Sequence, residues 1–157
     1  MQESLTRIYK EYKLSRDSIQ LTDAFVAHCS ADALEDLNDA GLYEEAPLNA
    51  LKLKHSYEWI SDNVARGYLL SEVDVLTGKT NQTIAKFSIK VVGIFKVIAD
   101  NNVEKKELVR RLELQIVPQL LPYVRSALTS LSSLMTLPPV VLPTMDVLLS
   151  MKKNGQA

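Results

Sequence analysis

The chain has 157 residues, of which 46% are hydrophobic and 24% are charged, and its formal net charge is −1. This composition is typical of one globular domain with its own hydrophobic core, and it excludes an intrinsically disordered chain. Only five glycines and six prolines are present. Because turns consume these residues, their scarcity argues against a fold of many strands.

The N-terminal third predicts short helices. Apolar side chains at three- and four-residue steps predict a first helix over residues 3–14, with one face made of Leu5, Ile8, Tyr9 and Tyr12. A short helical segment carrying Phe25 and Val26 follows. Ser30 stands in an N-cap position and predicts a further helix over 31–40, which Gly41 ends.

The middle of the chain predicts two longer helices. Pro47 suits the first turn of a helix that continues to about Leu76, with Leu48, Leu51, His55 and Trp59 at helical steps. Gly78 ends this helix. The next one, from about residue 81 to 98, has the most regular apolar face in the chain, formed by Ile84, Phe87, Val91, Ile94, Phe95 and Ile98.

The last third predicts helices interrupted by proline. A helix is expected over residues 103–117, and Pro118 and Pro122 predict a break near Gln119, because proline lacks the N–H that a helix interior needs. Helical spacing then resumes as far as Leu137, and a short segment follows over 144–151. The sequence therefore predicts one all-α domain over residues 1–157, built as a single helical bundle or as stacked helical hairpins of about six to seven helices. The domain is expected to be a subunit, or part of a subunit, of a larger assembly.

Gly78-Lys79-Thr80 resembles the end of a phosphate-binding loop. That loop requires a glycine at the position of Val73, so that backbone N–H groups can surround the phosphates, and Asp74 within it would repel them. A nucleotide site is therefore not predicted. The glycine is better explained as a helix end, with Thr80 or Asn81 as the next N-cap.

Other groups of reactive side chains are equally sparse. His28 and Cys29 are adjacent, which on a helix points them about 100° apart and prevents one from activating the other. His55, Glu58 and Asp62 share one helical face, but two histidines and one cysteine are too few for a structural zinc site. No catalytic residue, metal ligand or cofactor is predicted, and the chain is expected not to be an enzyme.

Charge and apolar patterning instead predict a protein-interaction domain. Eight acidic residues and no Lys or Arg lie between Asp17 and Leu51, whereas nine basic and four acidic residues lie between Lys79 and Arg125. We expect the partner-binding residues to be an apolar C-terminal anchor and a basic cluster: Leu137, Val140, Val141, Leu142, Lys105, Lys106, Arg110 and Arg111. The apolar anchor has an alternative interpretation as the last layer of the core. The alternative function is nucleic-acid binding by the basic helices between residues 79 and 125.

The sequence also predicts a location. The N-terminus has no apolar region of a secretory signal, and no stretch of about 20 residues is apolar enough to span a membrane as a helix. Cys29 is the single cysteine, which suits a reducing compartment. We therefore expect an intracellular protein, in the cytoplasm or the nucleus.

Overall fold

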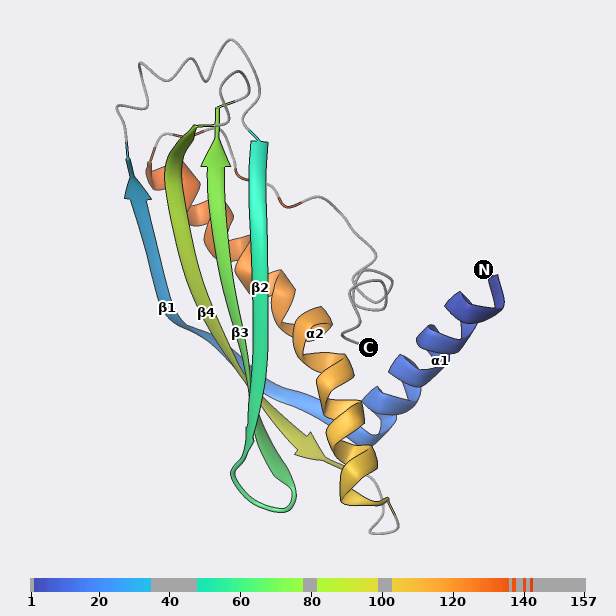
Figure 1. The fold of residues 1–157 in the computed structure, drawn as a ribbon. Helices are drawn as coiled ribbons and strands as arrows, with labels where there is room; N and C mark the ends of the chain where they lie inside the picture. The colour runs from blue at the N-terminus through green and yellow to red at the C-terminus, as the bar shows by residue number, and fades with distance from the viewer. Residues whose placement is uncertain are drawn as a thin grey trace.

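The computed structural model describes residues 2–34, 48–77, 82–98 and 103–135, together with 137, 140 and 142. Its elements in chain order are α1 (Gln2–Ser18), β1 (Ile19–Ala33), β2 (Leu48–Trp59), β3 (Val64–Leu76), β4 (Thr83–Val97) and α2 (Lys105–Leu134). The strands form one antiparallel sheet in the order β1-β4-β3-β2. Helix α2 lies along one face of this sheet, and α1 leans away from it with its C-terminal end beside α2 (Figure 1). The fold is α+β, so the prediction of an all-α bundle of six to seven helices is wrong.

The predicted helix over 47–76 is the hairpin of β2 and β3. Every second side chain of β3 is buried from Ala65 to Val75, which is the period of a strand with one face on the core. The two strands pair antiparallel from Leu48 opposite Leu76 to Trp59 opposite Ala65. The tight turn between them closes with hydrogen bonds from the N–H groups of residues 60 and 61 to the carbonyl oxygen of Val64.

The predicted helix over 81–98 is strand β4, at the centre of the sheet. Thr, Ile and Val make up seven of its 15 residues, and β-branched side chains pack well on a pleated surface but lose rotamer freedom in a helix. Strand β1 replaces the short segment predicted around Phe25, and it also includes residues 31–33 of the predicted helix over 31–40. Leu34 follows the strand, with its N–H donating to the carbonyl oxygen of Ile84 at 2.8 Å, and residues 35–40 of that predicted helix lie outside the described residues.

Two glycines allow α2 to approach the middle of the sheet. Gly67 of β3 lies directly opposite Gly93 of β4. A Cβ atom at Gly93 would lie 2.7 Å from Leu120 Cδ2, and one at Gly67 would lie 3.2 Å from Ile116 Cγ1. Such distances are shorter than van der Waals contact, so the two missing side chains leave the room that these buried residues of α2 fill.

Helix α2 continues through both prolines, so the predicted break near Gln119 is wrong. Pro118 and Pro122 each remove one backbone hydrogen bond. The buried face of α2 nevertheless extends on both sides of them, from Leu108 to Leu128, and packing against the sheet keeps the helix continuous. The N-terminal helix predicted over 3–14 is confirmed and is longer at both ends. Neither helix contains a stretch long and apolar enough to cross a bilayer, as judged over the part of the chain that is described.

Candidate functional site

The inner face of strand β2 carries a row of large apolar side chains that the fold covers only in part. Because alternate residues of a strand face the same side, Leu51, Leu53, Tyr57 and Trp59 all face the core side of the sheet. All four are half-buried, and they pack against the edge of the hydrophobic core. We call this set the β2 row. Helix α2 packs mainly against β1 and β4 and least against β2, which explains why the row keeps part of its surface exposed.

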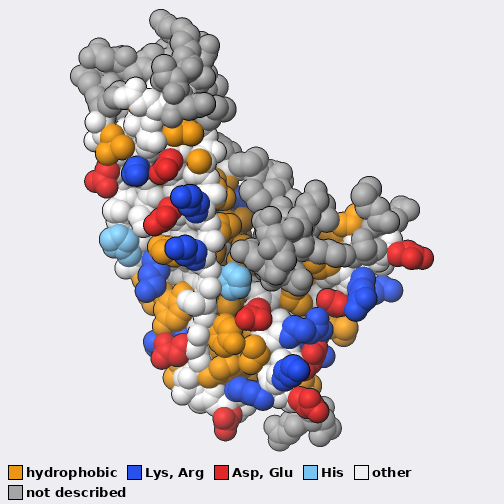
Figure 2. Space-filling model, in the orientation of Figure 1, with side chains coloured by type: hydrophobic (Ala, Val, Ile, Leu, Met, Phe, Trp, Pro, Cys, Tyr) orange, Lys and Arg blue, Asp and Glu red, His pale blue; other side chains and the backbone are white. Residues whose placement is uncertain are grey.

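The β2 row is visible from one side of the molecule. Figure 2 shows hydrophobic side chains gathered along the flank of β2 that faces α2, with charged side chains on either side. The strand is also an edge of the sheet, so its outward backbone groups have no partner strand among the described residues. Lys52 and Lys54 are exposed on the opposite face of β2, and lysines at such an edge oppose uncontrolled pairing between sheets.

Trp59, the only tryptophan of the chain, ends the β2 row beside the start of α2. The ammonium nitrogen of Lys105 lies 3.4 Å from the centroid of its ring. The indole Nε1 is buried and has no hydrogen-bond partner among the described residues. A cation over an indole face is an attractive contact. Lys105 therefore covers one face of the Trp59 ring and fixes this end of the β2 row against α2.

Two of the four residues of the basic cluster predicted on α2, both arginines, pair with carboxylates of the same chain. Arg110 pairs with Glu107 at 2.9 Å and with Glu11 of α1 at 3.3 Å, and Arg111 pairs with Glu107 at 3.1 Å. Hydrogen bonds from Arg110 are the main cause that lowers the pKa of Glu107 to about 2. The pair of Arg110 with Glu11 joins α1 to α2, and the two pairs of Glu107 lie within α2. Lys106 is exposed, and partner binding by the cluster stays a prediction.

The predicted C-terminal anchor lies against the core. The described members Leu137, Val140 and Leu142 are 6%, 3% and 4% exposed and belong to the core cluster. The backbone N–H of Val140 donates to Ser132 Oγ at 3.2 Å, which fixes the chain after α2. Val141 lies outside the described residues. A partner would therefore reach these three side chains only by displacing the segment, and their role in binding stays a prediction.

The histidines and the cysteine considered in the sequence as reactive groups lie on strands β1 and β2. His28 and Cys29 are adjacent on β1 and so point to opposite faces of the sheet, and Cys29 is exposed. His55 and Glu58 likewise face opposite sides of β2. No group of three or more His, Cys, Asp or Glu side chains suited to a metal ion occurs within the described ranges. Residues 78–80, the Gly-Lys-Thr segment, lie outside them, between the paired ends of β3 and β4.

Lys86, Lys90 and Lys96 of the basic region also lie on a strand. They are exposed on the outer face of β4, and the ammonium of Lys90 lies 4.9 Å from the centroid of the Tyr68 ring. The prediction of basic helices between residues 79 and 125 is thus wrong for these three lysines and right for the basic residues of α2. Nucleic-acid binding itself stays a prediction.

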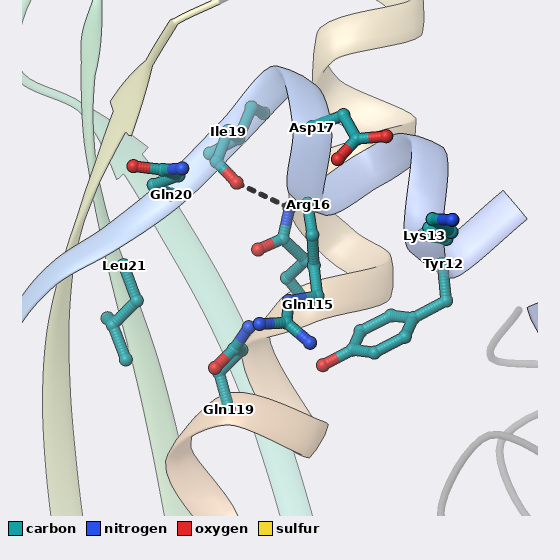
Figure 3. A pocket seen from close by; sticks show the side chains of 9 residues that line it. All are labelled: Tyr12, Lys13, Arg16, Asp17, Ile19, Gln20, Leu21, Gln115 and Gln119. Carbon is teal, nitrogen blue, oxygen red and sulfur yellow. Dashed lines mark hydrogen bonds between the residues drawn. The ribbon is translucent and has the colours of Figure 1, made fainter.

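A hollow, which we call the junction pocket, lies where α1, β1 and α2 meet, and no sequence pattern indicated it. Its volume is about 470 Å³, and it is lined by Tyr12, Lys13, Arg16 and Asp17 of α1, residues 19–21 of β1, and two glutamines of α2. Figure 3 shows the guanidinium of Arg16, the hydroxyl of Tyr12 and the amide of Gln119 lying together. Burial raises the pKa of Tyr12, against the opposing charge of Arg16, so this phenol stays protonated at neutral pH.

Gln115 ties the three elements of the junction pocket together. Its Nε2 donates to Ser15 Oγ at 2.8 Å and to the carbonyl oxygen of Ile19 at 3.0 Å. Its side chain is fully buried, and its Oε1 has no hydrogen-bond partner among the described residues. Figure 3 shows this oxygen on the side of the amide turned away from Ile19. The spacing of about 100 residues between these partners explains why no local sequence pattern indicates the pocket.

Comparisons with known proteins find a likeness of fold. No family model matches the chain, and no curated protein matches it either. One matching solved structure is that of a SecB-like chaperone of Mycobacterium tuberculosis in complex with a ChAD peptide from an antitoxin. It matches with a TM-score of 0.71 and 13% identity, over 87% of this chain and 97% of that one. A protein of unknown function from Streptococcus agalactiae matches with a TM-score of 0.42 and 13% identity, over 80% of this chain and 96% of that one. The chain thus has the fold of a SecB-like chaperone.

Proposed function

We propose that this chain is a non-enzymatic, chaperone-type protein that binds extended apolar segments of other proteins. The observation that carries the proposal is the β2 row, in which Leu51, Leu53, Tyr57 and Trp59 remain half-buried on an edge strand. Apolar side chains left partly exposed together on one strand are a usual feature of surfaces that receive a partner. The first matching structure holds a peptide from another protein, which supports the same class of role.

The geometry of β2 suits a segment in an extended conformation. Alternate residues of a strand are about 7 Å apart. Leu51 with Leu53 and Tyr57 with Trp59 therefore offer two pairs of apolar contacts at the spacing of every second side chain of an extended client, with His55 between the pairs on the same face. The outward N–H and C=O groups of the edge strand supply hydrogen bonds that do not depend on the client sequence. Together these features favour binding of many segments that share only their apolar character.

The proposal places the protein inside the cell, as expected from its single cysteine. Cys29 is exposed, and an exposed thiol persists in a reducing compartment. Separation of cellular fractions followed by immunodetection tests the location. Recovery only from a secreted fraction would contradict it.

The first experiment measures whether the protein keeps an unfolded client soluble. A model protein denatured in urea is diluted into buffer with and without this chain, and light scattering reports its aggregation. The fluorescence of Trp59 gives a second readout, because a client on the β2 row covers the ring. We expect suppressed aggregation together with lower quenching of Trp59 by acrylamide.

A pair of matched variants assigns the activity to the row. Leu53→Ser removes an apolar side chain from the inner face of β2, and Leu70→Ser makes the same change on the outer face of the neighbouring strand β3, where Leu70 is also half-buried. Loss of about 1.5–3 kcal/mol of apolar contact weakens client binding by about 10-fold or more in Leu53→Ser. Equal activity of the two variants, or a wild-type chain that leaves aggregation unchanged, would refute the proposal.

A further inference from the structure

The junction pocket lies at the other edge of the sheet from the β2 row, because β1 and β2 are the two edge strands. It is a polar hollow, lined by two cations, one carboxylate, one phenol and three amides. The function proposed for the β2 row does not use it. We propose that the junction pocket binds the free C-terminal carboxylate of a peptide, with Arg16 as the residue that pairs with the carboxylate.

Hydrogen-bond donors are the main groups at the point in the pocket where Arg16, Tyr12 and Gln119 lie together. Arg16 forms no ion pair with any described residue, and its one aromatic contact is with the Tyr12 ring, 5.9 Å from guanidinium carbon to centroid. A planar guanidinium matches a carboxylate with two parallel hydrogen bonds. The Tyr12 hydroxyl and the Gln119 amide stand beside it as further donors (Figure 3).

The charge of the pocket also selects an anion. Lys13 and Arg16 are positive, and Asp17 is the only acidic side chain that lines it. Figure 3 shows the Asp17 carboxylate directed away from the Arg16 guanidinium. A carboxylate beside Arg16 therefore meets one guanidinium directly, whereas the Lys13 ammonium and the Asp17 carboxylate both lie away from that point (Figure 3).

Two observations favour a peptide end over a simple organic acid. The last residue of a peptide carries an N–H group close to its carboxylate, and the unpartnered Oε1 of Gln115 is an acceptor in the wall of the same pocket. That oxygen is buried, so the ligand must displace the groups that cover it. The displacement is favourable because the ligand N–H then supplies the hydrogen bond that this buried acceptor lacks. Leu21 is half-buried at the β1 side and offers an apolar contact to the last side chain.

The test uses ligands that differ only in the group in question. N-acetylleucine supplies a carboxylate, an N–H and an apolar side chain, N-acetylleucine amide lacks the carboxylate, and acetate lacks the rest. Each is titrated into the ¹⁵N-labelled full chain and followed by two-dimensional NMR. We expect N-acetylleucine to shift the side-chain amides of Gln115 and Gln119 and the backbone of residues 16–21. It should bind about 10-fold or more tightly than the amide or acetate.

A charge-matched pair of variants locates the site. Arg16→Gln and Lys10→Gln remove one positive charge from exposed positions of the same helix, and Lys10 does not line the pocket. Arg16→Gln should lose about 10-fold or more of the affinity for N-acetylleucine while keeping its dispersed spectrum, and Lys10→Gln should keep it. Absence of binding to the wild-type chain, equal binding of N-acetylleucine and its amide, or unchanged binding in Arg16→Gln would each overturn the proposal. Acetate binding as tight as that of N-acetylleucine would overturn the assignment to a peptide end. None of these results depends on the activity of the β2 row.

Discussion

The substitution Gly93→Ala is expected to destabilise the protein by crowding α2 against the centre of the sheet. The new methyl carbon would lie 2.7 Å from Leu120 Cδ2 and 2.9 Å from Leu21 Cδ1, whereas carbon atoms in contact are about 3.5–4.0 Å apart. Leu21 is half-buried and has room to turn outward, but Leu120 is fully buried. The clash must therefore move α2 or force Leu120 from its rotamer.

The size of the effect follows from two opposing terms. Overpacking a core costs about 1–3 kcal/mol, and replacing a glycine by alanine returns about 0.4–1 kcal/mol by restricting the unfolded chain. The net loss in the free energy of unfolding is about 1–2 kcal/mol. For a domain of this length such a loss lowers Tm by about 2–8 °C.

Urea and thermal unfolding followed by circular dichroism measure this loss, with Ser56→Ala on the exposed face of β2 as a control. The double variant Gly93→Ala with Leu120→Val removes a methyl group at the clash, so its loss should be smaller than the sum of the two single losses by about 0.5 kcal/mol or more. A Gly93→Ala protein as stable as the wild type would refute the close approach of α2. Strict additivity in the double variant would refute the part assigned to Leu120.

Two further predictions concern contacts that involve α2. The Glu107 carboxylate has a pKa lowered from 4.5 to about 2, so its pairs with Arg110 and Arg111 stabilise the protein above pH 4.5 and are lost as the pH falls toward 2. Over that pH range the free energy of unfolding should fall further in the wild type than in Glu107→Gln, by up to about 1 kcal/mol because these groups are partly exposed. Urea midpoints at each pH measure the difference. Identical pH profiles of the two proteins would contradict the pairing. Lys105→Ala should cost about 0.5–1 kcal/mol and increase acrylamide quenching of Trp59, whereas Lys106→Ala at the next exposed position should change neither. Equal quenching in both variants would show that Lys105 does not cover the ring.

The two helices were within reach of sequence reasoning, but the strands were misassigned for an identifiable reason. Leu51, His55 and Trp59 follow one another at steps of four, and a step of four keeps a side chain on the same face of both a helix and a strand. The positions that distinguish the two periods are those at steps of two. Leu53 and Tyr57 are apolar there, which indicates a strand, and the alternation through β3 repeats the same pattern.

The scarcity of glycine and proline was also misleading. Strands β1 to β4 are 15, 12, 13 and 15 residues long, so three connections are enough for the whole sheet. A few long strands consume as few turn residues as a helical bundle does. In the opposite direction, Pro118 and Pro122 predicted a break that the packing of α2 overrides. Local rules thus failed where long-range burial decided the structure.

The placement of α2 determines both candidate sites, and no local pattern encodes it. Gly67 and Gly93 let the helix settle on the centre of the sheet, close to β4 and away from β2, and the apolar row of β2 stays partly exposed as a result. The same placement brings Gln115 beneath the start of β1, where it binds the carbonyl oxygen of Ile19 and closes one wall of the junction pocket. A shift of α2 forced by Gly93→Ala should therefore disturb both surfaces at once. If the variant folds, reduced client binding and weaker N-acetylleucine binding are expected together, whereas loss of only one would show that the two sites are set by different contacts.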